Sequence, residues 1–434
     1  MLDRMPETIG KYRITGELGR GATSCVYRAE DAFNQREVAI KVVRPPEMVE
    51  PSMAARYQRV FMNEAALAGR LNHPHIAAIY DAASEGALSY LVMEMVEGGT
   101  LEQFASPDRL MPVERLVEIV FKAAAALDYA HRHGVIHCDI KPANILITGD
   151  TDIKISDFGA AYFGAAQHTF LTGVGSPAYM APEQVQERQV NHQTDIYALG
   201  AVMYQLLTGR LPFHGSSRAS VMYQVVNIDP VPPSHLRPGL PEVMDRIVLK
   251  AMAKSRDDRY ATWKDFSRDL ADAFRDLGLR VEEVSDTEKF TALRGLSFFR
   301  DFRDVDVWEA LRIARWHRVE GGSTLLKEGD EAGGFFVLTH GRIQISRAGR
   351  VLERGEAGSC FGEILYFEEA SSRRTTTVTT TETCVAMELG ARELRGASDG
   401  LQLQFNRAFI RILVNRLEQR ESRLVAAQAA MSAV

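Results

Sequence analysis

The sequence predicts an α+β fold made of two successive parts: a sheet followed by helices, and a smaller β-rich part with flanking helices. Residues 12–43 alternate apolar and polar side chains, which is typical of antiparallel strands. Helical periodicity then takes over, as in residues 112–133. In residues 325–384 glycine turns separate short strands, which indicates a jelly roll or barrel.

These patterns divide the chain into four segments. We expect an N-terminal extension (1–11), a first domain (12–275), a linker or connecting helix (276–293) and a second domain (294–434). The length of 434 residues agrees with two or three domains.

Composition limits the classes of partner. A formal net charge of −6 gives no reason to expect binding to nucleic acid or to an anionic membrane surface. No apolar run is long enough to span a bilayer. The four cysteines are scattered without a Cys-x-x-Cys pair, which favours a reducing compartment. We therefore expect a cytoplasmic protein with neither a nucleic-acid nor a membrane partner.

A glycine-rich turn lies between the first two predicted strands. Gly19 and Gly21 let the backbone approach phosphates closely, and Val26 follows where it would cover a nucleotide base. An isolated glycine pair is weak evidence for such a loop. The next strand ends in Lys41, which by itself would be a solvated lysine, but the predicted helix 56–71 then supplies Glu64. In this order the residues favour a Lys41–Glu64 pair that holds the lysine against nucleotide phosphates.

Residues 131–159 contain several side chains that could take part in catalysis. Asp139, Lys141 and Asn144 place a base, a cation and an amide on one loop, and Asp157 adds a carboxylate before Phe-Gly. That set suits transfer of a nucleotide γ-phosphoryl group to a hydroxyl, where catalysis is mostly positioning and charge neutralisation. A zinc site is a weak alternative, because the histidines at 131, 133 and 137 straddle a glycine.

These motifs together resemble the protein kinase family over residues 12–275, most closely the bacterial serine/threonine kinases of the eukaryotic (Hanks) type. Residues 175–183, Gly-Ser-Pro-Ala-Tyr-Met-Ala-Pro-Glu, are similar to the end of that family's activation segment. The resemblance implies a two-lobed protein kinase fold, ATP and Mg²⁺ as cofactors, and protein substrates that present serine or threonine.

The resemblance also implies individual roles. Asp139 would be the base, Lys141 would steady the transferred phosphate, and Lys41 with Glu64 would complete the catalytic set. Asn144 and Asp157 would hold Mg²⁺. The nucleotide would contact Gly19, Gly21, Val26, Ala39, Lys41, Glu94, Val96 and Leu146. Structural roles are implied for His137, which braces the loop, for Asp195, which ties the loop to a helix, and for a Glu183–Arg259 pair.

One residue departs from the family pattern. Cys138 stands where the family usually has an arginine that clamps a phosphate on the activation segment. A thiol cannot form that charge-assisted pair. Control by phosphorylation of Thr169 or Thr172 is therefore less expected, and a signal from elsewhere in the chain is favoured.

The second domain resembles the cyclic-nucleotide-binding domain, with a β jelly roll and flanking helices. The resemblance rests on Phe-Gly-Glu-Ile at 361–364 and on Arg374-Thr375 before Thr-Thr-Val. It implies that Glu363 accepts a ribose 2′-hydroxyl proton, that Arg374 takes the cyclic phosphate, and that Thr375 favours guanine. Arg373 replaces the usual proline, so two alternatives stay open: a domain that binds cAMP or cGMP, and an empty domain that docks a protein.

Residues 401–430 form an amphipathic pattern that predicts a lid helix. Its apolar residues (Phe405, Phe409, Leu413, Leu417 and Leu424) would face the domain core or form a seam in a homodimer. The sequence thus predicts an ATP-dependent protein serine/threonine kinase regulated by its C-terminal domain. The alternatives are a pseudokinase or scaffold whose C-terminal domain senses a ligand or docks a partner, and a cyclic-nucleotide-gated adaptor.

Overall fold

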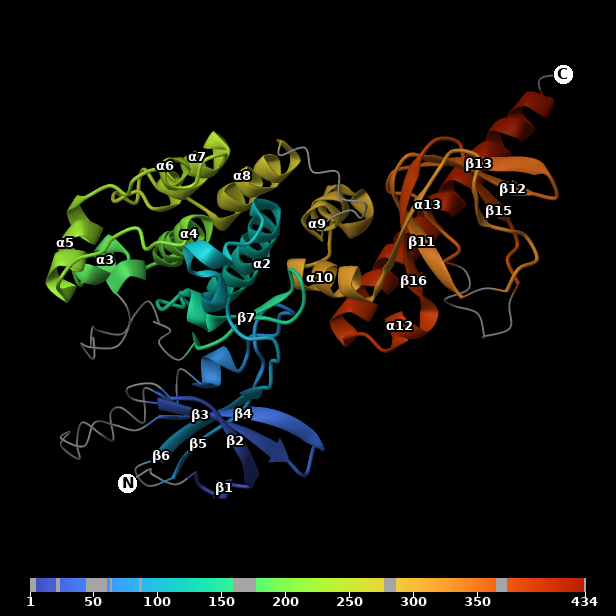
Figure 1. Ribbon diagram of the computed structural model, residues 1–434. Coiled ribbons are helices and arrows are strands. Elements are labelled where there is room, and N and C mark those ends of the chain that lie inside the picture. Colours follow the sequence, from blue (N-terminus) through green and yellow to red (C-terminus); the bar gives the residue numbers. More distant parts are fainter. Residues whose placement is uncertain are drawn as a thin grey trace. The chain divides into compact units, whose positions relative to one another are not determined.

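The computed structural model describes residues 5–20, 24–43, 61–62, 65–85, 88–158, 177–276, 286–331, 333–363 and 373–432. The chain divides into two compact units, Met1–Glu282 and Glu283–Val434, which are described separately below (Figure 1).

The first unit begins with an antiparallel six-stranded sheet in the order β1-β2-β3-β4-β6-β5. Its strands are β1 (Thr8–Ile9), β2 (Tyr12–Arg20), β3 (Ser24–Asp31), β4 (Arg36–Val43), β5 (Ile79–Glu85) and β6 (Leu88–Glu94). Strand alternation puts Ile40 and Val92 in the apolar cluster on one face of the sheet, and Ala39 and Met93 in the cluster on the other. The alternation predicted over residues 12–43 is confirmed. Of the predicted helix 56–71, residues 61–62 and 65–68 are helical, and Glu64 lies outside the described residues.

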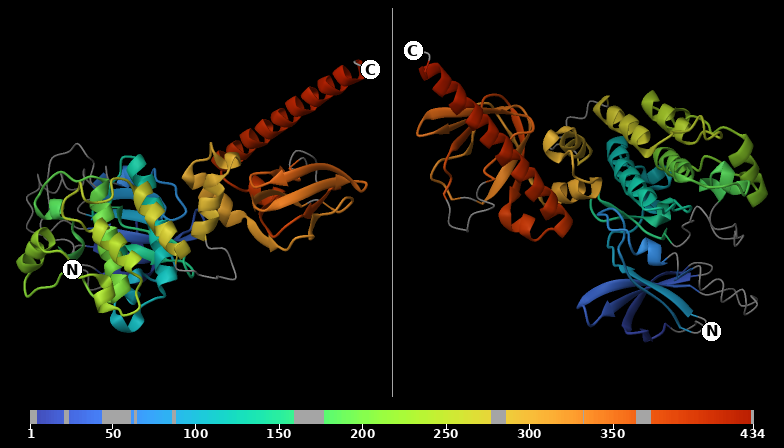
Figure 2. Two further views of the ribbon diagram at one scale, coloured as in Figure 1. Left: turned by 90° about the horizontal axis from the view of Figure 1, so that it is seen from above. Right: turned by 180° about the vertical axis from the view of Figure 1, so that it is seen from behind.

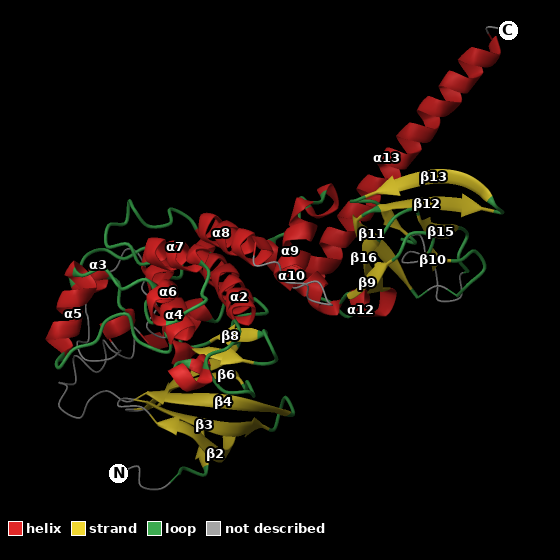
Figure 3. Cartoon of the chain, turned by 45° about the horizontal axis from the view of Figure 1, so that its top comes forward, coloured by secondary structure: helices red, strands yellow, loops and turns green. Residues whose placement is uncertain are grey.

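The rest of the first unit is mainly helical (Figure 3). Its helices are α2 (Val113–Arg132), α3 (Pro182–Val185), α4 (His192–Thr208), α5 (Arg218–Asn227), α6 (Pro233–Leu236), α7 (Glu242–Ala251) and α8 (Trp263–Asp276), and a hairpin pairs β7 (Ile145–Ile147) with β8 (Ile153–Ile155). Helix α4 is buried along most of its length. Its Asn191 cap and left-handed Gly209 fix the two ends. Helix α2 packs against this buried helix, and the loop that begins after His133 follows directly from α2.

The second unit contains two four-stranded antiparallel sheets, in the orders β10-β15-β12-β13 and β14-β11-β16-β9. The strands are β9 (Arg315–Val319), β10 (Thr324–Leu326), β11 (Gly334–His340), β12 (Arg342–Arg347), β13 (Arg350–Glu356), β14 (Cys360–Phe361), β15 (Thr377–Thr380) and β16 (Cys384–Gly390). Leu338, Ile343, Val378 and Ala386, from four strands of both sheets, share one apolar cluster. The expected β-rich domain is therefore confirmed.

Helices flank these sheets: α9 (Asp286–Gly295), α10 (Asp304–Ile313), α12 (Ala391–Arg395) and α13 (Asp399–Ser432). An aromatic cluster joins them to β11 through Phe299, Phe335, Phe405 and Phe409. Helix α9 lies within the segment expected to be a linker or connecting helix. Because its Leu293 is fully buried in this cluster, that part of the segment packs with the second unit.

Helix α13 is longer than the core it covers. Phe405 and Phe409 are buried as predicted, and the apolar cluster beneath the helix ends at Ile412. Further along, the Leu417 side chain is 61% exposed. The helix extends beyond the sheets of its own unit (Figure 2). The helix as far as Ile412 therefore matches the core-facing alternative, whereas Leu417 does not, and the Leu424 side chain lies outside the described residues.

Candidate active site

Lys41 reaches the site from the inner face of the sheet. In the strand register it lies opposite Val26 of β3 and Leu91 of β6, while Ala39, on the same face, lies opposite Met93. The Lys41 ammonium lies 2.8 Å from the Asp157 carboxylate. This ion pair joins the sheet to the helical part of the unit.

The loop after α2 gathers three more of the predicted residues. The Lys141 Nζ donates to Asp139 Oδ2 over 2.7 Å. The Asn144 side-chain amide donates to the Asp139 carbonyl at 2.8 Å and to its carboxylate at 3.1 Å. The structure thus brings Asp139, Lys141 and Asn144 into direct contact.

Side chains of Asp195 and His137 hold the backbone of this loop. Cys138 and Asp157 both have a positive φ, 62° and 64°, which residues other than glycine rarely adopt. Asp195 of α4 accepts hydrogen bonds of 2.8 Å from the backbone N–H groups of His137 and Cys138. The His137 ring lies 2.9 Å from the Ser156 carbonyl, beside the residue that precedes Asp157. The bracing expected of His137 and Asp195 is therefore confirmed.

Burial and charge set the ionisation of the half-buried Asp157 and the buried Asp195 carboxylates. Burial would raise the pKa of Asp157, but the charge and hydrogen bond of Lys41 outweigh burial, so this pKa lies below its ordinary value. Burial raises the pKa of Asp195, against the lowering effect of His137 and of the two backbone donors. Asp157 is therefore the carboxylate that stays ionised most readily.

The residues present fit Mg²⁺. The Asn144 amide nitrogen donates to Asp139, and the side-chain oxygen, which makes no hydrogen bond to the described residues, is left as a possible metal ligand. The Asp157 carboxylate, beside Lys41, is the second possible ligand. One or two protein oxygens plus substrate phosphates are the usual Mg²⁺ ligands. Within the described part of the chain, no group of three or more His, Cys, Asp or Glu residues could hold a metal ion. His131 and His133 point to different partners, the His192 ring and the Tyr129 carbonyl.

Comparisons with known proteins agree with this geometry. The family described as "Protein kinase domain" matches residues 12–270, more than half of the chain. The chain belongs to this family. A second family, "Cyclic nucleotide-binding domain", matches residues 316–399.

Curated relatives match the kinase domain. The serine/threonine-protein kinase PknB of Mycobacterium leprae is 41% identical over 273 residues, which are 61% of this chain and 43% of that protein. PknB of Mycobacterium tuberculosis is 40% identical over 268 residues, 60% of this chain and 42% of the relative. The probable serine/threonine-protein kinase SCO3848 of Streptomyces coelicolor is 38% identical over 269 residues, 60% and 39%. The chain thus spans less than half the length of these relatives. Among the described residues no helix is long and apolar enough to cross a membrane.

The segment from Glu94 to Val96, expected to contact the nucleotide and called the hinge below, contains an anchor that sequence reasoning missed. The Glu94 carboxylate pairs with Lys154 at 3.0 Å and accepts the Ala78 backbone N–H at 3.1 Å. The Glu94 side chain is therefore engaged with the domain, so a nucleotide contact at this residue would have to come from its main chain. Lys154 alternates with the buried Ile153 and Ile155 of β8, and this alternation was the available signal.

The remaining predicted nucleotide contacts have the following positions. Gly19 lies opposite Val26 in the β2–β3 register. Val96 and Leu146 are half-buried, and Leu146 forms a backbone bridge with Thr100 beyond the hinge. Gly21 lies outside the described residues.

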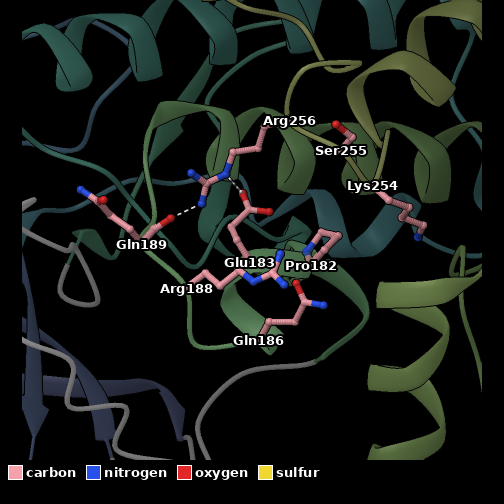
Figure 4. Close-up of a pocket in the computed structure, with 8 residues that line it drawn as sticks. All are labelled: Pro182, Glu183, Gln186, Arg188, Gln189, Lys254, Ser255 and Arg256. Carbon is pink, nitrogen blue, oxygen red and sulfur yellow. Dashed lines mark hydrogen bonds and ion pairs between the residues drawn. The ribbon is translucent and has the colours of Figure 1, made fainter.

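A separate hollow of about 490 Å³ opens in the helical lobe of the kinase domain (Figure 4). It is lined by Pro182, Glu183, Gln186, Arg188, Gln189, Lys254, Ser255 and Arg256. Beside it, Glu183 is 4% exposed and accepts hydrogen bonds of 2.9 and 3.1 Å from Arg259, which confirms the predicted pair. Burial would raise the pKa of Glu183, but Arg259 holds it below its ordinary value. None of the predicted catalytic residues lines this hollow.

In the C-terminal domain, the two side chains expected to hold a cyclic nucleotide are both buried. Glu363 is 1% exposed and Arg374 is 7% exposed, whereas Thr375 is exposed. The Arg374 Nη1 has no hydrogen-bond partner among the described residues. Glu363 instead pairs with Arg416 of α13. Sequence reasoning missed Arg416, although it follows Phe409 by seven residues and therefore lies on the same helix face.

Proposed function

We propose that this chain is an ATP-dependent protein serine/threonine kinase. One observation supports it most: Lys41, Asp157, Asp139, Lys141 and Asn144, which come from separate segments, form two contacting groups in one unit. The similarity to curated serine/threonine-protein kinases supports the class of acceptor.

The chain's own residues account for the chemistry as follows. Asp139 orients the acceptor hydroxyl and takes its proton, and Lys141, 2.7 Å away, supplies positive charge for the transferred phosphate. Lys41 holds the phosphates of ATP, and Asn144 and Asp157 would hold Mg²⁺. When bound, that ion neutralises charge on the phosphate oxygens. Catalysis is then positioning and charge stabilisation, with no covalent intermediate on the protein.

The test is phosphate transfer from labelled ATP to a generic protein substrate and to the chain itself. We expect Asp139→Asn to abolish incorporation into serine and threonine. Asp150→Asn is the matched control, because Asp150 is an 84%-exposed aspartate on the β7–β8 hairpin of the same domain. Wild-type protein that binds ATP without transferring phosphate would instead identify a pseudokinase.

We further propose that the C-terminal domain binds a cyclic nucleotide and regulates the kinase. The support is Arg374, whose pKa burial lowers and whose Nη1 lacks a hydrogen-bond partner among the described residues. A buried guanidinium nitrogen without a hydrogen-bond partner is costly, and a ligand phosphate would supply one. For regulation, the ligand must bind the active and restrained states with different affinities.

Thermal unfolding with cAMP and with cGMP tests the ligand. At a hundred times the dissociation constant, binding adds about 2.7 kcal/mol to the domain that holds the ligand. We expect Arg374→Ala to remove the shift and Arg373→Ala, the exposed neighbour, to retain it. If neither nucleotide changes the melting curve or the kinase rate, the domain is the protein-docking alternative. In a gated adaptor, deletion of residues 294–434 would abolish function without raising kinase activity.

A further inference from the structure

Arg416 lies at the proposed ligand site but comes from a helix outside the cassette that carries Glu363 and Arg374. Its guanidinium pairs with the Glu363 carboxylate and donates to the Cys360 carbonyl at 2.8 Å. Glu363 is almost fully buried, whereas the Arg416 side chain is 31% exposed. The charge of a buried carboxylate is therefore satisfied by a helix that covers the domain from outside.

Arg374, by contrast, has a side-chain nitrogen, Nη1, without a hydrogen-bond partner among the described residues. Its Nη1 lies so close to Gly362 that a Cβ at that glycine would come within 2.6 Å of it. Gly362 also has a φ of 82°, which favours glycine. Arg374 thus lies against the glycine that precedes Glu363, whereas Glu363 itself is paired with Arg416.

Helix α13 connects this pair to the rest of the unit. Its apolar contacts with the domain core end at Ile412, one turn before Arg416. Val414 and Leu417, on either side of Arg416, are 45% and 61% exposed. The contacts that attach this stretch of the helix to the domain are therefore polar. One of them is with Glu363, the carboxylate expected to accept a ligand hydroxyl.

We infer that Arg416 is a displaceable counter-ion of Glu363, so that ligand binding releases the distal half of α13. Glu363 is 1% exposed, so we expect the paired guanidinium to move when a ligand hydroxyl donates to this carboxylate. Two partners that hinder each other at one group are coupled, and the coupling is reciprocal. Occupancy of the pocket is thereby transmitted to a helix that leaves the domain. This inference rests on the proposed cyclic-nucleotide site.

The chain offers a matched control in Arg411, on the same helix. Arg411 pairs with Asp301 and donates to the Phe298 carbonyl at 3.0 Å, away from Glu363. Arg411→Gln therefore loosens α13 without freeing the carboxylate. Arg416→Gln does both.

The experiment measures the affinity of the full chain for cAMP and cGMP by calorimetry. We expect Arg416→Gln to raise affinity by roughly 5- to 150-fold, the usual range of such couplings, and Arg411→Gln to leave it close to wild type. Unchanged or weaker binding by Arg416→Gln, or an equal gain in Arg411→Gln, overturns the inference.

Amide hydrogen exchange on the wild-type chain provides a second measurement that needs no variant. Saturating nucleotide should increase exchange in residues 413–432, because the polar hold on the helix is lost. Decreased exchange there overturns the inference. Binding by Arg416→Gln alone supports it, since wild type would then be closed by Arg416. If neither protein binds either nucleotide, the proposed ligand and this inference both fail. If wild type binds but Arg416→Gln does not bind more tightly than wild type and Arg411→Gln, only the inference fails.

Discussion

The Lys41 ammonium lies 2.8 Å from the Asp157 carboxylate, which joins the sheet of the kinase domain to its helical lobe across the active site. The pair keeps the lysine extended into the site and the carboxylate ionised. Protein contacts alone therefore position both groups. Such preorganisation is what electrostatic catalysis at the proposed site would need.

We expect Lys41→Met to lower the rate of phosphate transfer by about 10²- to 10³-fold, the cost of removing one preorganised charge-stabilising donor. Initial rates with labelled ATP measure it. Lys11→Met is the control, because Lys11 is 58% exposed and pairs with Asp81 at 3.9 Å. Equal activity of the two variants would contradict the role given to Lys41.

Loss of the Arg259 guanidinium should destabilise the kinase domain. Arg259→Met leaves the buried Glu183 without its bidentate partner, and breaking a buried pair in this way costs about 3–5 kcal/mol. Urea unfolding measures the difference. The exposed Arg268, paired with Asp265, is the comparison, and its replacement by Met should change stability by less than about 0.5 kcal/mol. Similar midpoints for both variants would refute the argument.

The same pair predicts a pH dependence. Because the pKa of Glu183 is lowered from 4.5 in the folded state, its stabilising contribution is fully present above that pH and is lost as the pH falls through the folded-state pKa. We expect the stability advantage of wild type over Glu183→Gln to shrink as the pH is lowered below 4.5. Urea unfolding of both proteins in a pH series measures it, and an advantage that grows on acidification would reverse the assigned sign.

Cys138 predicts an unusual response to phosphorylation of the activation segment. Replacing Thr169 and Thr172, both outside the described residues, with Ala should change the wild-type rate little. The same replacements in a Cys138→Arg background should lower the rate, because arginine can pair with a phosphate and a thiol cannot. The measurement compares steady-state phosphorylation rates of wild type, Cys138→Arg, and each of these with the two threonines replaced by Ala. A large loss in the wild-type background would show that another cation binds the phosphate.

The homodimer suggested by the sequence stays a prediction, and the exposed side of α13 makes it specific. Leu403, Ile410 and Leu417 repeat every seven residues and are 49%, 58% and 61% exposed, a spacing that suits an identical helix from a second copy. We expect the full chain to sediment as a dimer and Leu417→Glu as a monomer. Asn415→Glu, exposed but off the stripe, should remain dimeric. A monomeric wild type at micromolar concentration would end this prediction.

The contacts among the proposed catalytic residues could be predicted from the sequence because they are local. Asp139, Lys141 and Asn144 lie within six residues, so the spacing that revealed them also places them in contact. The Glu183–Arg259 pair, by contrast, was available only through family resemblance, since 76 positions separate its members.

Contacts between distant segments were the part that could not be predicted. Lys154 meets Glu94, and Arg416 meets Glu363, only after separate elements have packed together. Likewise, the apolar pattern of α13 did not distinguish Phe409, which faces the core, from Leu417, which lies past the end of that core. A helical period identifies a face, but the extent of the opposing surface decides how much of it is buried.

The left-handed backbone of Cys138 separates two properties of the catalytic loop. Its N–H donates to Asp195 and its carbonyl accepts a 2.9 Å hydrogen bond from the Gln184 side-chain amide, so contacts to the main chain hold the path toward Asp139. A replacement of the side chain at 138 keeps both of these main-chain anchors available. The response of the loop to a phosphate and the backbone path of the loop can thus change independently at this one position.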